Sequence, residues 1–241
     1  HDTLSAASAL ATDGIQQWAP DTLDLGWVPT VWGHGLIRLD EAGQTDHGLD
    51  YNQAWMNDVL PQFARETPRE FTASDEVALA SVASWVQKQR PDAGLDALLN
   101  SASAYLSDPP ITDEGAIEHW MGIGFLQEPF KDQVWVDSQF MFGMVWLHEF
   151  DRTGDLALLD VTAEQYRLFS DLLRNPDDQL YLHAYDDNTD TNIPADDTYW
   201  ARGNAWVLIS GVELLARLPA HHPDRNRTLA LVQTHASAVI D

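Results

Sequence analysis

The segment Phe140-Met141-Phe142-Gly143-Met144-Val145-Trp146-Leu147 is apolar without interruption. A helix that is apolar on every side has no face to present to water, and such helices are buried on all sides. We therefore expect this segment to form an inner helix that is enclosed by other helices of the same assembly.

Helical periodicity also dominates the rest of the chain. The apolar residues of 155–173 fall three or four positions apart, which places them on one face of a helix. Similar patterns predict helices at 3–18, 33–42, 50–65, 74–89, 93–106, 138–151, 201–218 and 225–240. No stretch alternates convincingly as a strand does, so we predict an all-α fold of about nine helices.

A short pattern recurs inside three of these predicted helices. Gly35, Gly143 and Gly211 each begin a Gly-aliphatic-x-x-Leu core. Repeated helical hairpins stack into a toroid or a solenoid. We expect a single domain over residues 1–241 with this kind of architecture.

The charge balance limits the partners of the chain. The 241 residues include 38 Asp and Glu but only 13 Lys and Arg, a formal net charge of −25. This field repels nucleic acid and anionic membranes, so we expect neither as a partner. The large negative charge fits either a high-salt habitat, where ions screen the repulsion between carboxylates, or a simply acidic protein. The chain has no cysteine, which excludes disulfides and thiolate chemistry.

The sequence gives little information on compartment. No stretch reaches the roughly 18 uninterrupted apolar residues of a membrane span. Residues 1–18 also lack the basic head and continuous apolar run of a signal peptide. We expect a soluble protein and leave open whether it is cytoplasmic, periplasmic or exported.

Two long segments, 108–136 and 175–199, resist helix assignment and are rich in Pro, Gly and acidic residues. Loops of this length are usually functional. Both lead directly into the start of a predicted helix, at Trp135-Val136-Asp137 and at Trp200-Ala201-Arg202. We expect a functional site where these two loops end.

Asp137 is the leading candidate for chemistry in that site. Burial beside aromatic rings raises a carboxyl pKa, whereas a helix N-terminus lowers it. If burial dominates, Asp137 can donate a proton near neutral pH, as the acid of a glycosidase must. The alternative is a helix N-cap, a position at which Asp is favoured.

Tyr181-Leu182-His183-Ala184-Tyr185-Asp186 places His183 between aromatic residues. Sugar sites combine aromatic faces with a few polar groups that orient the ring. Arg202 offers a planar fork that suits a carboxylate. An ordinary salt bridge for Arg202 and a structural hydrogen bond for His183 are the competing interpretations.

No metal site or cofactor is expected. The acidic run from Asp186 to Asn192 has the spacing of a calcium loop but lacks its Gly at position six and its Glu at position twelve. No H-E-x-x-H, P-loop or G-x-S-x-G sequence occurs.

With these residues identified, the chain resembles the unsaturated glucuronyl and rhamnogalacturonyl hydrolases (glycoside hydrolase families 88 and 105). The resemblance extends from about Trp32 to the C-terminus. Four segments carry it: Trp135-Val136-Asp137-Ser138-Gln139-Phe140-Met141, Tyr181-Leu182-His183-Ala184-Tyr185-Asp186, Trp200-Ala201-Arg202-Gly203-Asn204-Ala205-Trp206 and Ser74-Asp75-Glu76.

The resemblance implies an (α/α)6 barrel and an unusual reaction without metal or cofactor. The substrate is an oligosaccharide, left by a polysaccharide lyase, that ends in an unsaturated uronic acid. The enzyme hydrates the C4=C5 double bond, and Asp137 protonates it and then activates the water. Asp75 is implied as the second catalytic residue, and the implied substrate-binding residues are His183, Arg202, Trp200, His119 and Trp206.

The sequence departs from this pattern in helix number. A complete barrel of this type has twelve helices, and the periodicity predicts about nine. We therefore expect a barrel that is incomplete at its C-terminal end and has apolar edges. A homo-oligomer that covers the open edge is one expected consequence.

Other functions stay open. Another (α/α)6 carbohydrate enzyme is one alternative, either an inverting glycosidase that uses Asp75 with Asp137 or a sugar epimerase that uses histidines. A sugar-binding fragment without catalysis is the other. Asp75 alone also fits a capping role, because it lies in a first helical turn. The sugar next to the uronic acid is not indicated.

Overall fold

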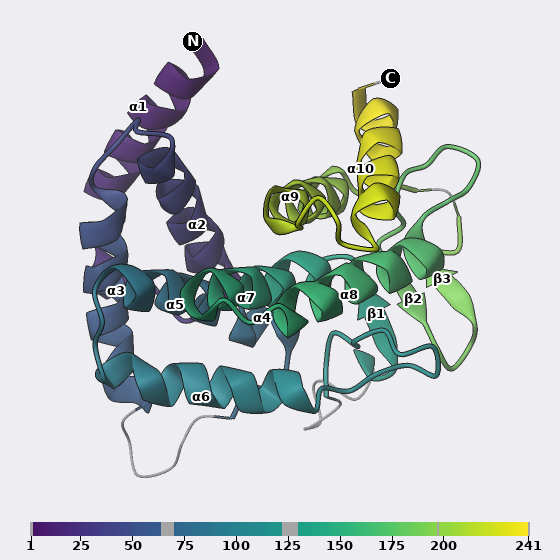
Figure 1. Cartoon of the computed structure of the whole chain (residues 1–241), viewed down its shortest axis with the longest axis horizontal. Helices are drawn as coiled ribbons and strands as arrows, with labels where there is room; N and C mark the ends of the chain where they lie inside the picture. The colour runs from purple at the N-terminus through teal and green to yellow at the C-terminus, as the bar shows by residue number, and fades with distance from the viewer. Residues whose placement is uncertain (1, 64–69, 122–129, 197, 241) are drawn as a thin grey trace.

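The structure is a computed structural model that describes residues 2–63, 70–121, 130–196 and 198–240. Each of the predicted helical segments is a helix in it (Figure 1). The helices are α1 (Asp2–Gln17), α2 (Trp27–Glu41), α3 (Gly48–Phe63), α4 (Ser74–Val77), α5 (Leu79–Gln89), α6 (Gly94–Ser107), α7 (Ser138–Thr153), α8 (Ala157–Leu173), α9 (Ala201–Arg217) and α10 (Arg225–Ile240), with a 3-10 turn η1 (Pro20–Thr22). The all-α prediction is confirmed, and the last two residues predicted for the third helix, 64 and 65, lie outside the described residues.

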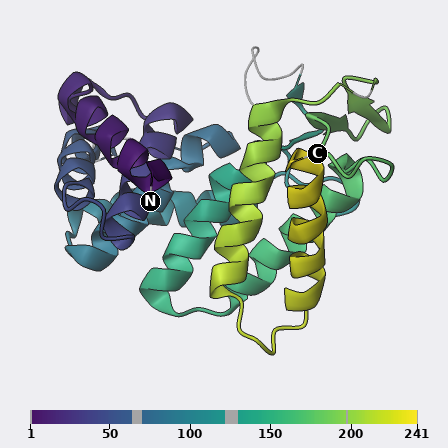
Figure 2. The same ribbon diagram turned by 90° about the horizontal axis from the view of Figure 1, so that it is seen from above.

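Helix α7 is the inner helix that its apolar sequence predicts. It packs against α5 on one side and α9 on the other, and α2 packs against α5. Every residue from Ser138 to His148 is buried. Helices α6, α8 and α10 lie outside these, and Figure 2 shows α10 beside α9, with α7 on the other side of α9.

The inner helices run in the same direction. Near their N-termini, the rings of Trp27 on α2 and Trp206 on α9 are 6.2 Å apart. Near their C-termini, Arg38 Nε on α2 lies 3.1 Å from a Glu213 carboxylate oxygen on α9. Helix α7 follows the same course, because Phe140 near its N-terminus contacts Trp206 with ring centres 4.9 Å apart, while His148 nearer its C-terminus stacks on His34 of α2 at 5.6 Å. The N-termini of α2, α7 and α9 therefore lie at one end of the assembly.

A small antiparallel sheet joins the two long loops. Its strands β1 (Gln133–Trp135), β2 (Ala184–Asp186) and β3 (Thr191–Ile193) are arranged in the order β1-β2-β3. The expectation of no strand was wrong here, because strands of three residues are too short to show alternation. Val134 pairs with Tyr185, and this pairing joins loop 108–136 to loop 175–199.

One main core holds the helices together. Its buried apolar side chains run along the chain from Leu25 to Val232. A smaller cluster joins α1, α2 and α3 through Ala11, Leu36 and Tyr51. In the part of the chain that the structure describes, no helix has both the length and the apolar character needed to cross a membrane.

Candidate active site

Strand pairing places Asp137 beside His183. Val136 donates its backbone N–H to the carbonyl of His183 at 2.9 Å. Asp137 occupies the N-cap position of α7, but its side chain makes no capping hydrogen bond. Its Oδ2 is buried without a hydrogen-bond partner among the described residues, and His183 Nε2 lies 3.4 Å away. The backbone therefore holds the carboxylate at the helix start, where Oδ2 lies within ion-pairing distance of His183 but accepts no hydrogen bond from the described residues.

The second carboxylate, Asp75, lies in the short helix α4. The neighbouring Glu76 reaches back to the chain before α4, where its Oε2 accepts hydrogen bonds from the Thr72 N–H at 2.9 Å and hydroxyl at 3.1 Å. Burial raises the pKa of Asp75 to about 7, and the charges of Asp137 and Glu76 add to the effect. Near neutral pH this pair of carboxylates therefore holds a proton on Asp75 in a substantial fraction of molecules.

Aromatic rings line the same end of the assembly. The His183 ring centre is 5.1 Å from that of Trp135 and 4.8 Å from that of Trp200. The Arg202 guanidinium stacks on Trp200, 4.2 Å from the ring centre, and lies 5.6 Å from the ring centre of Trp27. A continuous series of contacts thus connects Asp137 to Arg202.

Arg202 is exposed and forms no ion pair or hydrogen bond within the described ranges. The salt-bridge alternative for this residue is therefore not realised among them. An unpaired cation in a chain with a net charge of −25 is unusual, because acidic side chains are abundant. Its planar fork is available to an external carboxylate.

The two remaining predicted site residues are buried. Trp206 is 5% exposed and packs beneath the site against Phe140, with ring centres 4.9 Å apart. His119 is 1% exposed and stacks on Trp135, with ring centres 4.6 Å apart. Direct contact of either residue with a substrate stays a prediction.

Local structure explains the motif Trp200-Ala201-Arg202-Gly203-Asn204-Ala205-Trp206. A Cβ at Gly203 would lie 2.7 Å from a Val136 methyl and 2.9 Å from the Trp200 ring. Asn204 accepts the Tyr181 N–H and donates to the Tyr181 carbonyl, both at 2.9 Å. Glycine and asparagine therefore lock the start of α9 onto the strand region that carries His183.

Sequence reasoning did not select three residues that the structure brings to this end. Trp27 contacts Arg202, and the hydroxyls of Ser74 and Ser138 lie within hydrogen-bonding distance of His119. The position of each serine directly beside a candidate aspartate was the one available signal. Because a serine at a helix start is usually an N-cap, the sequence did not distinguish these two serines from ordinary caps.

The acidic loop after β2 is occupied with its own contacts. Asp186 Oδ1 accepts hydrogen bonds from the Thr189 N–H and hydroxyl, both at 3.0 Å, and Oδ2 accepts one from Gln133 at 3.1 Å. Within the described residues, no group of three or more His, Asp or Glu side chains is arranged to hold a metal ion.

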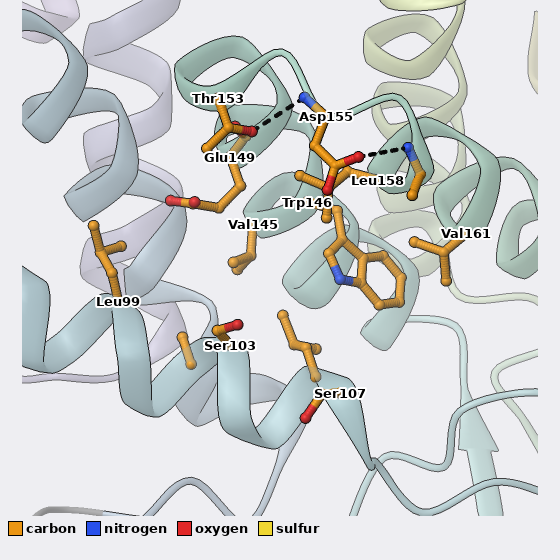
Figure 3. A pocket seen from close by; sticks show the side chains of 13 residues that line it. Leu99, Ser103, Ser107, Val145, Trp146, Glu149, Thr153, Asp155, Leu158 and Val161 are labelled. Atoms are coloured by element: carbon orange, nitrogen blue, oxygen red, sulfur yellow. Dashed lines mark hydrogen bonds between the residues drawn. The ribbon is translucent and has the colours of Figure 1, made fainter.

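A separate hollow of about 460 Å³ lies between α6, α7 and α8 (Figure 3). Its lining is mainly apolar, with Leu99, Val145 and Trp146 among the residues that line it. Its acidic residues already have partners: Glu149 pairs with Arg152, and Asp155 accepts the Ala157 N–H at 3.1 Å. Since neither Asp75 nor Asp137 borders it, this hollow is distinct from the candidate active site.

Parallel inner helices with flanking outer helices, and a carboxylate pair among tryptophans at one end, define an (α/α) barrel of the carbohydrate-active type. The chain belongs to Glycosyl Hydrolase Family 88, whose family model matches residues 7–241.

Individual relatives are distant in sequence. The chain is 22% identical over 202 residues to the unsaturated rhamnogalacturonyl hydrolase YesR of Bacillus subtilis (strain 168), a match that covers 82% of this chain and 55% of the relative. It therefore spans about half the length of that curated relative.

Solved structures confirm the (α/α)6 barrel class. A family 105 glycoside hydrolase of C. acetobutylicum ATCC 824 matches with a TM-score of 0.78 at 18% identity, over 97% of this chain and 65% of that one. An unsaturated glucuronyl hydrolase from Bacillus sp. GL1 matches with a TM-score of 0.59 at 14% identity, over 96% of this chain and 82% of that one.

Proposed function

We propose that this protein removes a terminal unsaturated uronic acid from lyase-generated oligosaccharides by hydration of the C4=C5 double bond. The observation that carries the proposal is the state of Asp137. Its carboxylate stands at a helix start without capping it, and its buried Oδ2 has no hydrogen-bond partner among the described residues. A carboxylate placed in this way, with His183 Nε2 3.4 Å from the same oxygen, is suited to proton transfer.

The neighbouring carboxylate supports the same reaction. Burial and the charge of Asp137 raise the pKa of Asp75 to about 7. Asp75 therefore holds a proton in a substantial fraction of molecules under conditions in which isolated carboxyls are ionised. In the proposed reaction Asp137, in its protonated form, delivers a proton to C4 of the sugar, and positive charge develops at C5; a protonated Asp75 keeps a second negative charge away from it.

Water completes the reaction. The ionised Asp137 takes a proton from a water molecule as its oxygen bonds to C5, which restores the acid and forms a hemiketal. The hemiketal opens to a C5 ketone, and C1 then releases the neighbouring sugar. Proton and oxygen balance is met by one water molecule, so the proposed steps use no further reactant.

The surroundings favour an acidic sugar. Arg202 offers an unpaired guanidinium among the described residues, and Trp200 beside it offers a partly exposed ring face. The N-termini of α2, α7 and α9 point their positive dipole ends to this end of the barrel. These groups offset the negative field of the chain where the uronate carboxylate binds, and we propose His183 as the residue that orients Asp137.

The proposal extends to the organisation of the chain. We propose that residues 1–241 form one (α/α) barrel domain, as the single main core supports. Apolar side chains remain exposed on α9 and α10, among them Ile209, Val212 and Leu229. We propose that a second copy covers this edge, which light scattering across a concentration series tests.

A panel of lyase-generated disaccharides tests the proposed function. The ultraviolet absorbance of the conjugated double bond should fall when the wild-type protein meets its substrate, because hydration removes the conjugation. A saturated disaccharide of the same sugars should stay intact. Cleavage of the saturated sugar would favour an ordinary inverting glycosidase, and binding without turnover would favour a non-catalytic protein.

A further inference from the structure

Three buried polar side chains meet behind the two carboxylates. His119 Nδ1 lies 2.7 Å from the hydroxyl oxygen of Ser74 and 2.7 Å from that of Ser138. The two hydroxyl oxygens are 2.9 Å apart. His119 is 1% exposed, and both serines are fully buried. We call these three residues the serine–histidine triangle.

The triangle connects the two helices that carry the carboxylates. Ser74 directly precedes Asp75 at the start of α4, and Ser138 directly follows Asp137 at the start of α7. Each serine is therefore one residue from its aspartate. A contact between the serines fixes the two helix starts relative to each other.

His119 is itself held from several sides. The Ser74 N–H donates to the His119 carbonyl at 3.0 Å, and the His119 N–H donates to the Gln133 carbonyl at 2.8 Å. Its imidazole stacks on Trp135, with planes inclined by only 10°. The ring has no room to rotate, so it serves both serines as a rigid anchor.

The hydrogen-bond inventory selects one tautomer of His119. If Nδ1 accepts, one serine donates to Nδ1 and the other donates to the first serine, so both hydroxyl hydrogens find acceptors in the triangle. If Nδ1 carries the proton, one hydroxyl hydrogen has no acceptor there. Buried donors are rarely left unpaired, which favours the proton on Nε2. That Nε2 faces Asp75 Oδ2 at 3.8 Å.

We propose that His119, Ser74 and Ser138 are positioning residues that set the separation of the Asp75 and Asp137 carboxylates. The kinetic part of this inference rests on the proposed function. The structural part, an imidazole fixed in the Nε2–H tautomer by two serines, does not.

The consequence for the reaction follows from electrostatics. The charge of Asp137 raises the pKa of Asp75, and this effect weakens as the two carboxylates move apart. Loss of the Ser74–Ser138 contact releases the two helix starts, the carboxylates that it holds together move apart, and the pKa of Asp75 should fall. The alkaline limb of the activity profile then moves to lower pH, which a general loss of stability would not cause.

The test uses the full chain with S74A, S138A and the double variant, and S84A as the matched control. Ser84 is also fully buried, but its hydroxyl has no hydrogen-bond partner among the described residues. Imidazole nitrogen NMR of histidine-labelled protein, with His119 assigned by its absence in H119N, gives a readout that needs no activity.

The expected NMR result is a neutral Nε2–H tautomer of His119 that does not titrate between about pH 5 and 8. In the double variant we expect a mixture of tautomers, and in S84A no change. An Nδ1–H tautomer in the wild type, or an unchanged tautomer in the double variant, overturns the triangle.

The expected kinetic result, on a substrate that the wild type turns over, is a kcat reduced by roughly tenfold to a hundredfold in S74A and S138A with KM little changed. The alkaline limb of the pH–activity profile of S74A and S138A should shift to lower pH, while the profile of S84A should match that of the wild type. An unshifted limb in folded, active variants overturns the positioning role. Failure of the wild type on every unsaturated uronide would overturn the proposed function and leave the NMR test of the triangle in force.

Discussion

His183 Nε2 lies 3.4 Å from Asp137 Oδ2, an oxygen that has no hydrogen-bond partner among the described residues. This contact joins two segments that are far apart in the sequence and is created by the pairing of β1 with β2. The arrangement orients the Asp137 side chain, which makes no capping hydrogen bond to α7. The predictions below follow from it and from its surroundings.

Asp137→Asn should lower kcat by well over a hundredfold, because an amide cannot deliver a proton. The fold should survive, since the carboxylate neither caps α7 nor forms a hydrogen bond through Oδ2. Initial rates and thermal unfolding measure the two effects. Asp58→Asn, at an exposed position of α3, is the matched control and should leave the rate unchanged. Near-normal turnover in Asp137→Asn would eliminate the proposed mechanism.

Arg202→Met should raise KM for the acidic sugar by roughly tenfold to a hundredfold, because a charge-assisted hydrogen bond contributes about 1.5–3 kcal/mol. The kcat should change less, since in the proposed reaction Arg202 binds the uronate carboxylate and transfers no proton. Arg167→Met is the control, because Arg167 is occupied with Asp171 on α8 at 2.9 Å. Equal KM values for the two variants would remove Arg202 from the binding site.

Gly203→Ala should reduce kcat/KM and destabilise the fold by about 1–3 kcal/mol, the usual cost of overpacking. The added methyl would press on Val136 and on the Trp200 ring, the two neighbours of the site. Gly143→Ala is the helical control, because a Cβ there meets nothing within 4 Å. Urea unfolding and steady-state kinetics should show a lower stability and a lower kcat/KM for Gly203→Ala than for Gly143→Ala. Equal values for the two variants would contradict the tight packing of Gly203 against Val136 and Trp200.

Stability should fall as pH drops below about 6.5. Burial, followed by the charges of His34 and Arg217, lowers the pKa of His148 to about 3. The unfolded chain, with a histidine pKa near 6.5, therefore binds more protons between these values, and acid favours unfolding. His148→Asn retains a donor toward the Ser81 carbonyl, which His148 Nδ1 contacts at 2.8 Å. Its unfolding free energy should vary with pH less steeply, by about 1.4 kcal/mol per pH unit. Parallel plots of unfolding free energy against pH for the wild type and His148→Asn would contradict a buried, neutral His148.

The helices were predictable because a helix with one buried face has apolar residues three or four positions apart along its whole length. The start of α2 at Trp27 instead of residue 33 was missed, since Pro29 reads as a breaker although proline is tolerated in a first turn. The candidate site was found through Asp137, His183 and Arg202, where short motifs concentrate rare residue types.

The remaining parts of the site depend on contacts that leave no local signal. The strand β1 has three residues, too few to show a period. The serine–histidine triangle joins positions 74, 119 and 138, and only the folded chain brings them together. Glu76 rather than Asp75 accepts the Thr72 N–H, a choice between neighbouring carboxylates that spacing does not determine.

Whether the protein acts at the double bond is tested most directly with a C-glycoside of the unsaturated uronic acid, in which a C–C bond replaces the glycosidic C–O bond. Hydration at C4 and C5 does not require that bond to break. We expect the wild-type protein to remove the double-bond absorbance of the C-glycoside and Asp137→Asn to leave it unchanged. An intact C-glycoside under conditions in which the matching O-glycoside is cleaved would contradict this expectation, because the protein would then act at the anomeric carbon.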